Sequence, residues 1–453
     1  MRAFASVVLA GWVGSRSRPS SCSRCRSLVL PLAVVGVLVA AWGAGAGVSV
    51  RGVTTRASGR ADAQPGAADI SADGRYVVFV SLRKGFLGSV LVHDRQTGRT
   101  TVASVTGDGS LPDGSSGRLD VLSSYVPVGI SSGGRYVGFT SWASNLVAGD
   151  AGGLRSVARL FVRDMQAGVT TEVGGGYFAA MSADGRKVAF FGGSGTTGGG
   201  FELFVRDLVS GVTTAASVAP DGAQANSLVS PASLSANGRF VAFSSYASHL
   251  VPGDTNSHEV VFVRDLQSGV TSLVSVALDG GSANGDSGTP AISADGRYVA
   301  FESDASDLVR GDTNESRDVF VRDLLTGKTT RVSVSSNGGE GWSPGYPVEM
   351  NWNGVAISAD GRVVAFVSDL NGLVRRDDNE IPDVFVRDRG SGVTSLVSVA
   401  STGVGANGPS LGAIAISGHG RDIAFGSGAT NLVSRPKLVN WGVYVRDRLA
   451  TRR

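Results

Sequence analysis

The stretch Ile292 to Phe301, ISADGRYVAF, occurs in seven similar copies along the chain. Each copy is followed, after a loop of variable length, by a second phrase of the type VFVRDLxTGxTT. A repeat with a period of several tens of residues indicates stacked supersecondary units, none of which can bury its own faces alone. The fold can therefore be predicted from the repeat. The other six copies begin at Ile70, Ile130, Met181, Leu234, Ile357 and Ile416.

Each unit has the density of β-branched and aromatic residues that is typical of short strands, and no window shows a helical period. In the quoted unit we expect strands A to D at Thr289 to Ser293, Arg297 to Ser303, Asp318 to Asp323 and Lys328 to Val334. Strands B and C are apolar on both faces, as in a sheet packed between neighbouring sheets. Four-stranded units repeated seven times around an axis predict an all-β fold, a single seven-bladed β-propeller over residues 47–453.

The residues common to all seven copies have structural explanations. Gly296 follows Asp295 in a tight turn, where Gly can take a positive φ. Arg297 opens strand B and Asp323 closes strand C, so we predict a cross-strand ion pair in each blade. Phe301 is expected to be buried between blades. The Asp of the turn is replaced in other copies by Asn237, Gly133 or His419, which indicates a turn former and not a catalytic carboxylate.

The seventh unit has no fourth strand, because the chain ends at Arg453 soon after strand C (Gly442 to Arg448). The segment Val50 to Ala57, VRGVTTRA, is similar to the strand D segments of other units, such as SGVTTAASVA. We therefore predict that this N-terminal strand completes the last blade. The ring would then be closed without an exposed edge.

Residues 1–46 contain five arginines, no acidic residue and the apolar run Leu28 to Ala41, followed by Ala44-Gly45-Ala46. This is the pattern of a secretory signal peptide. The alternative is an uncleaved anchor, because Leu28 to Ala46 is 19 residues long and just able to span a bilayer. Cys22 and Cys25 precede the run without a second pair, which favours neither a redox nor a zinc role. We expect the protein to be secreted or to lie in the extracytoplasmic cell envelope.

The formal charge of +3 comes from this leader, since the rest of the chain has 36 basic and 38 acidic residues. A nearly neutral chain without a basic cluster has little electrostatic reason to bind nucleic acid. We expect a monomer that contacts a protein or a cell-envelope polymer. Contact with a membrane is expected only through the N-terminal segment, if that segment is uncleaved.

The phrase ISADGRYVAF followed by VFVRDLxTG resembles the TolB-like, WD-repeat-like propeller repeat of bacterial exported proteins. The resemblance covers all seven units, residues 50–449. It implies an envelope or secreted propeller used for protein or ligand contacts, usually without catalysis of its own. Neither the N-terminal domain of TolB nor a hydrolase domain like those of related peptidases is recognised in the sequence.

The A–B and C–D turns of a blade lie on one face of the disc, here named the turn face. The B–C and D–A loops lie on the opposite face, here named the loop face. The turns are short and nearly identical between copies, whereas the loops vary. Binding residues are disproportionately found on loops over a rigid scaffold, so the loop face is the predicted working face.

The B–C loops of the fifth and sixth copies place oxygen ligands at i, i+2 and i+6, a spacing that suits Ca²⁺. The loops lack the Gly and the distal Glu of an EF-hand. The alternative is that Asp and Asn cap turns here and that the last Asp protects the start of a strand. The residues are Asp312, Asn314 and Asp318 in the fifth copy, and Asp377, Asn379 and Asp383 in the sixth.

The connection Ser335 to Val355 is one of the two longest and contains Trp342, Tyr346 and Trp352. Aromatic side chains in a Gly/Pro-rich loop can stack on sugars or anchor a protein partner. They can equally pack down as a lid on their own blade. These three residues are the predicted ligand- or partner-binding residues.

No catalytic set is evident. The four histidines fall at unrelated repeat positions, and the repeated serines have no matching base. We therefore predict a non-enzymatic binding scaffold. The alternative is a secreted carbohydrate-active enzyme, a hydrolase or lyase, with acidic loop residues near the central channel. Carboxyl groups converging on the channel mouth would favour the enzyme, and a mouth lined by small and apolar groups would favour the scaffold.

Overall fold

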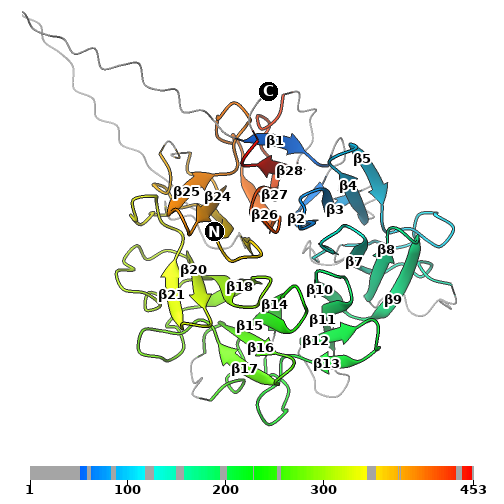
Figure 1. Cartoon of the computed structure of the whole chain (residues 1–453), viewed down its shortest axis with the longest axis horizontal. Helices are drawn as coiled ribbons and strands as arrows, with labels where there is room; N and C mark the ends of the chain where they lie inside the picture. Colours follow the sequence, from blue (N-terminus) through cyan, green and yellow to red (C-terminus); the bar gives the residue numbers. More distant parts are fainter. Residues whose placement is uncertain are drawn as a thin grey trace, which may run out of the picture. The chain divides into compact units, whose positions relative to one another are not determined.

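In the described residues of the computed structural model, all regular secondary structure is β-strand, in seven four-stranded antiparallel sheets. The sheets stand around a ring, as Figure 1 shows. The predicted seven-bladed β-propeller is thus confirmed. The predicted leader, residues 1–46, lies outside the described part of the chain. The structure describes residues 52–58, 63–82, 88–117, 127–148, 158–193, 201–227, 229–252, 257–343, 354–375, 377, 379–434 and 441–450.

Every blade has the strand order A, B, C, D from the axis outward. Strands A are β2 (Ala63–Ile70), β6 (Gly129–Ile130), β10 (Tyr177–Met181), β14 (Val229–Leu234), β18 (Ser287–Ile292), β22 (Val355–Ile357) and β26 (Ser410–Ile416). Strands B are β3 (Tyr76–Leu82), β7 (Tyr136–Ser141), β11 (Lys187–Gly193), β15 (Phe240–Ser245), β19 (Tyr298–Ser303), β23 (Val363–Ser368) and β27 (Asp422–Ser427). Strands C are β4 (Gly88–Asp94), β8 (Arg159–Asp164), β12 (Phe201–Asp207), β16 (Val260–Asp265), β20 (Asp318–Asp323), β24 (Asp383–Asp388) and β28 (Gly442–Asp447). Strands D are β5 (Arg99–Val102), β9 (Val169–Gly175), β13 (Thr213–Ala215), β17 (Val270–Leu273), β21 (Lys328–Arg331), β25 (Val393–Leu396) and β1 (Val53–Arg56).

The N-terminal strand β1 completes the last blade, as predicted. It pairs antiparallel with β28, from Val53 opposite Asp447 to Arg56 opposite Tyr444. The edge of β28 is thereby covered, and the two ends of the described chain are joined in one sheet.

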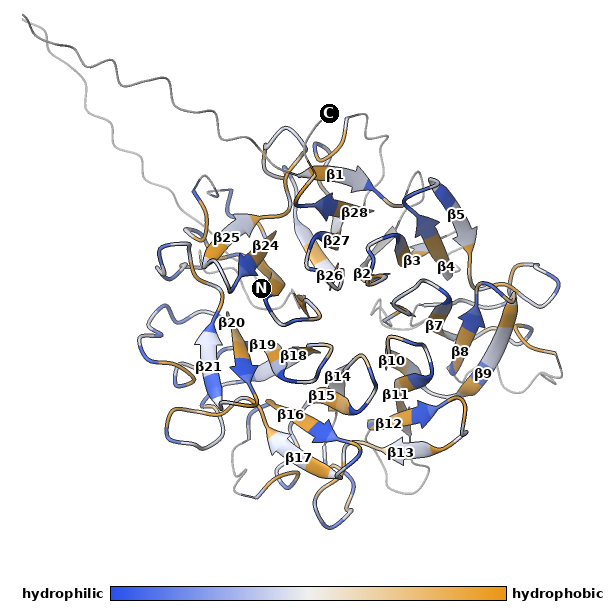
Figure 2. Cartoon of the chain, in the orientation of Figure 1, coloured by the Kyte–Doolittle hydropathy of each residue, from blue (hydrophilic) through white to orange (hydrophobic). Residues whose placement is uncertain are grey.

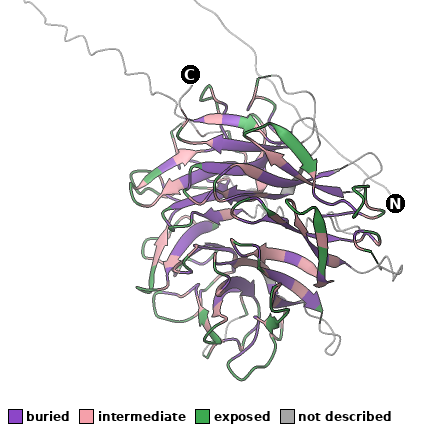
Figure 3. Ribbon diagram, turned by 45° about the vertical axis from the view of Figure 1, so that its right-hand side comes forward, coloured by how far each residue is buried: buried purple, intermediate pink, exposed green. Residues whose placement is uncertain are grey.

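The core lies between the blades and is built from strands B and C, such as β19 and β20, whose residues are mostly buried. Figure 3 shows buried residues along most of the strands. Phe301 is fully buried, and its ring stacks on Phe320 of the same blade with centroids 5.9 Å apart. The prediction of a buried Phe is confirmed. Similar strand B to strand C ring pairs are Phe139–Phe161, Phe190–Phe204, Phe243–Phe262, Phe366–Phe385 and Phe425–Tyr444.

Strands C end in hydrophilic residues on the turn face, visible at the arrowheads in Figure 2. There Arg297 binds Asp323 through two contacts, Nε to Oδ1 at 2.9 Å and Nη2 to Oδ2 at 2.8 Å. The predicted pair is confirmed in six blades and wrong in the third, where Arg186 and Lys187 act on Asp207 only at longer range. The other five pairs are Arg75–Asp94, Arg135–Asp164, Arg239–Asp265, Arg362–Asp388 and Arg421–Asp447.

The repeated Ser and Gly shape the A–B turn. Ser293 Oγ accepts the backbone NH of Tyr298 at 2.9 Å and donates to Asp295 at 2.6 Å. Gly296 has φ 80°, and a Cβ added there would lie 2.2 Å from the ring of Phe240 in the preceding blade. Gly is therefore required both for the backbone conformation and for the contact between blades.

A closed circuit of backbone hydrogen bonds joins the seven A–B turns. The residue after the repeated Ser donates its NH to the carbonyl of the equivalent residue in the next blade, over 2.8 to 3.0 Å. The seventh bond returns to the first blade, so every blade is tied to both neighbours near the axis. The circuit runs Ala72, Ser132, Ala183, Ala236, Ala294, Ala359, Gly418 and back to Ala72.

Candidate functional site

The loops of the loop face are fastened to one another by a repeated side-chain contact. Asn284 in a D–A loop accepts the NH of Ser306 in the following B–C loop at 3.0 Å and donates to its Oγ at 3.1 Å. These hydrogen bonds hold neighbouring loops in a defined arrangement. Sequence reasoning missed this contact, although an Ala-Asn pair recurs in the D–A loops. The equivalent pairs are Asn226–Ser248, Asn407–Thr430 and Asp113–Ser144.

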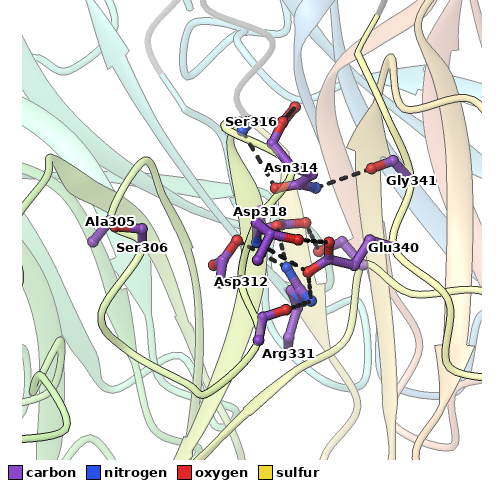
Figure 4. Close-up of polar contacts among 12 residues, drawn as sticks. Ala305, Ser306, Asp312, Asn314, Ser316, Asp318, Arg331, Glu340 and Gly341 are labelled. Atoms are coloured by element: carbon purple, nitrogen blue, oxygen red, sulfur yellow. Dashed lines mark hydrogen bonds and ion pairs between the residues drawn. The ribbon is translucent and has the colours of Figure 1, made fainter.

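The acidic loop of the fifth blade converges on a guanidinium group (Figure 4). Arg331 Nη1 lies 2.9 Å from Asp312 Oδ1 and 2.9 Å from Asp318 Oδ2, and Nη2 contacts Glu340. The Arg331 side chain is only 9% exposed. Arg331, at the end of β21, thus supplies between these carboxylates the positive charge that a calcium ion was expected to supply.

The three carboxylates of this cluster differ in their affinity for protons. Burial, together with the nearby charge of Asp318, raises the pKa of Asp312 to about 6. Burial also raises the pKa of Asp318. The hydrogen bond from Arg331 lowers the pKa of Glu340. One guanidinium therefore does not fully offset three carboxylates.

Asn314 lies beside this cluster, and its side-chain hydrogen bond to Asp318 partly opposes the effect of burial on the pKa of that carboxyl group. Its Nδ2 donates to the carbonyl of Gly341 at 3.0 Å, and its Oδ1 accepts the NH of Ser316 at 3.3 Å (Figure 4). The first contact ties the B–C loop to the next D–A loop, and the second caps a turn. This is the turn-capping role weighed as the alternative to calcium.

In the sixth blade a leucine, Leu396, takes the register position of Arg331. Asp383 is fully buried there, accepts Asn379 Nδ2 at 2.8 Å and accepts the hydroxyl of Ser398. Burial raises the pKa of Asp383 to about 6. Asp377 lies between two residues outside the described ranges. Calcium binding at these positions stays a prediction, and the described residues contain no group of three His, Cys, Asp or Glu side chains arranged to hold a metal ion.

The backbone of Trp342 is fixed by hydrogen bonds, whereas the residue as a whole is largely exposed. Its NH and carbonyl pair with the carbonyl and NH of Asn371 in the next blade, at 3.1 and 3.0 Å. The residue is 57% exposed. Tyr346 and Trp352, predicted from the same loop, lie outside the described residues.

The central channel is lined by strands A of all seven blades and encloses about 690 Å³. Its lining consists mainly of Ala, Gly, Pro, Val, Leu and Ile residues, and among the described lining residues Asp69 alone carries an ionisable group. In the described part of the chain, Asp and Glu carboxyl groups therefore do not converge on the channel.

A second group of charges, which sequence reasoning did not single out, lies at the loop-face ends of blades four and five. Glu302 of β19 is 4% exposed, accepts the NH of Gly354 at 3.3 Å and lies 3.8 Å from Arg317 Nη1. Glu259 accepts the hydroxyl of Ser244 at 2.6 Å. Burial raises the pKa of both glutamates. A comparison of the seven copies could have singled out Glu302, because it is the one charged residue at the position after the repeated Phe. The other copies have Val80, Thr140, Phe191, Ser244, Val367 and Gly426 there.

No helix of the described chain has the length and apolarity needed to cross a membrane. No protein-family model and no curated protein matches the sequence.

The solved structures similar to this chain include TolB proteins and other propellers. The propeller domain of the Trilobed protease from Pyrococcus furiosus is 9% identical, with TM-score 0.50, over 86% of this chain and 94% of that one. TolB from Acinetobacter baumannii is 12% identical, with TM-score 0.40, over 72% of this chain and 63% of that one, so less than two thirds of TolB is spanned. Oligogalacturonate lyase from Vibrio parahaemolyticus is 12% identical, with TM-score 0.48, over 87% of this chain and 93% of that one. At these identities the likeness concerns the propeller fold alone.

Proposed function

We propose that this chain is an exported, non-enzymatic β-propeller that binds a protein or a cell-envelope polymer through its loop face. The observation that carries the proposal is Trp342, whose backbone is paired with Asn371 while more than half of the residue is exposed. Exposed aromatic side chains are frequent anchors of binding surfaces, and a backbone that is already ordered loses little further conformational entropy on binding.

The surroundings of Trp342 support the same proposal. The loops beside it are fastened by side-chain contacts, so they present a defined surface. Two acidic side chains in these loops hold them in place: Glu340 contacts Arg331, and Asp369 accepts the hydroxyl of Ser343 at 2.9 Å. We include Tyr346 and Trp352 in the proposed surface on sequence grounds.

The proposal can be tested by retention of the purified protein on a bacterial cell-envelope fraction, before and after protease treatment of that fraction. Trp342→Ala should reduce retention at least severalfold, and Leu325→Ala is the control, since Leu325 is a 74% exposed residue on the turn face. Loss of retention after protease treatment would identify a protein partner, and persistence a polymer. Equal retention of both variants and the wild type would contradict the proposal.

The second candidate, a secreted carbohydrate-active enzyme, is favoured by Glu302 and Glu259. A buried carboxyl group with a raised pKa is what a general acid of glycoside cleavage requires. Release of reducing ends from acidic polysaccharides, abolished by Glu302→Gln, would support this candidate. Absence of any release by the wild type would leave the binding scaffold.

A further inference from the structure

Asp69 stands at the end of β2 on the wall of the central channel. Its Oδ1 accepts the NH of Ile70 at 2.7 Å, and its Oδ2 accepts the NH of Ile130 in the next blade at 3.0 Å. The side chain is thus fixed between blades one and two. Asp69 is only partly buried, and it forms part of the channel lining.

The contact with the next blade does not require a carboxylate. In blade four the equivalent residue is Ser233, whose Oγ accepts the NH of Ile292 in blade five at 3.2 Å. The other five blades have Gly129, Ala180, Ala291, Ala356 and Ala415 at this position and no side-chain acceptor at all. The fold therefore needs at most a hydroxyl group at this position. A charged group in an apolar channel opposes folding. A ligand is therefore the simplest reason for the charge of Asp69.

We propose that the central channel binds an organic ammonium ion, with its cationic group paired to the Asp69 carboxylate and its aliphatic part against the apolar wall. The wall offers Val128, Met181, Leu234, Ile292, Ile357 and Ile416 for that contact.

Charge and volume both select this class of ligand. Within the described lining the channel carries one negative and no positive side chain, so an anion meets no partner and a cation meets one. A cavity of about 690 Å³ falls in the range of small-molecule sites, which combine an apolar lining with a few fixed polar groups. Burial raises the pKa of Asp69 to about 6, and a bound cation would offset this penalty on the ionised form.

The test is calorimetric titration of the full chain at pH 7.5 with n-hexylammonium chloride and with 1-hexanol, its neutral counterpart. Wild type should bind the ammonium at least about tenfold more tightly than the alcohol, as expected for a hydrogen bond to a charged group. Asp69→Asn and Asp69→Ser should abolish this preference, the latter reproducing the arrangement of blade four. Asp295→Asn, a turn-face variant with the residue found at Asn237, is the matched control and should keep the preference.

Equal affinity of wild type for the two probes, binding of neither, or an unchanged preference in Asp69→Asn would each overturn the inference. Melting curves of the variants verify that the channel is intact. A short lysyl peptide and its Nε-acetylated form separate two sources of the ammonium group: tighter binding than hexylammonium indicates a polypeptide lysine, and weaker binding a small amine. Trp342 takes no part in this site, so the inference does not depend on the proposed loop-face function.

Discussion

Arg95 Nη1 lies 2.9 Å from Asp422 Oδ1, across 327 positions of sequence, and this ion pair joins the first blade to the last. At the equivalent place between blades five and six, Arg389 lies over the ring of Tyr298, 4.7 Å from its centroid. Between blades four and five, Leu324 and Phe240 belong to one hydrophobic cluster. Among these three contacts between neighbouring blades, the one between the last blade and the first is thus the one formed by an ion pair.

We expect Asp422→Ala to lower the free energy of unfolding by about 3 kcal/mol, because Arg95 would be left largely buried without its partner. The double variant Arg95→Leu with Asp422→Phe copies the Leu324–Phe240 seam and should recover most of the loss. Chemical denaturation of the three proteins measures the effect. A single variant as stable as the wild type would show that the pair contributes nothing to closure.

Strand β1 should be required for cooperative unfolding. A chain beginning at residue 59 lacks the strand that covers β28, and it loses the bond of 3.1 Å between Arg446 Nη1 and Thr54 Oγ1. Compared with a chain beginning at residue 47, it should melt at a lower temperature and over a broader range. Coincident calorimetric traces for the two chains would contradict this role of β1.

Alanine substitutions at two turn glycines distinguish the cost of a positive φ from the cost of a steric clash between blades. Gly327 has φ 69°, and the atom nearest to an added Cβ is Arg322 Nη2, at 3.7 Å. Gly327→Ala should therefore lower stability by about 1–2 kcal/mol through the positive φ alone. Gly296→Ala adds a clash with the ring of Phe240 and should lower stability by about 1–3 kcal/mol more. Equal losses in the two variants, measured by urea denaturation, would contradict the steric explanation of the repeated Gly.

Asp383 should make stability fall as the pH rises. Its pKa of about 6 in the folded protein exceeds the ordinary value near 4, so between these values the folded state binds more protons than the unfolded state. The stabilisation from protonated Asp383 is complete below about pH 4 and is lost as the pH rises through about 6.

The variant Asp383→Asn cannot ionise, so its stability relative to wild type should improve by up to about 3 kcal/mol between pH 4 and pH 7.5. Denaturation at several pH values measures this difference. Asp295→Asn controls for the removal of a negative charge elsewhere. A difference between Asp383→Asn and wild type that does not change with pH would show that Asp383 has an ordinary pKa.

Arg331 should be essential to the loop cluster of blade five. Arg331→Leu copies the residue of blade six but leaves Asp312, Asp318 and Glu340 together without a cation, and should lower stability by about 3–5 kcal/mol at pH 7.5. Adding Asp312→Asn should restore part of this loss. If the single variant melts like the wild type, the cluster does not depend on its guanidinium group.

The sequence alone determined the seven blades, the strand order within them, the closing role of the N-terminal strand and six cross-strand ion pairs. These features depend on contacts that repeat at a fixed spacing, such as Arg297 with Asp323, so seven copies of one pattern report one geometry. Gly296 and Phe301 were predictable for the same reason, because each copy places them in the same turn and the same buried strand.

Only the tertiary structure decided which residues meet between blades and between loops. Arg331 lies 19 positions after Asp312 and Arg95 lies 327 positions from Asp422, and neither pair repeats in the other copies. The same holds for the solitary Asp69, which is an unremarkable residue in its own copy and becomes distinctive only when seven inner strands surround one channel. Charge pairing and burial at such positions depend on distances through space, which a repeat pattern specifies only for the residues that repeat.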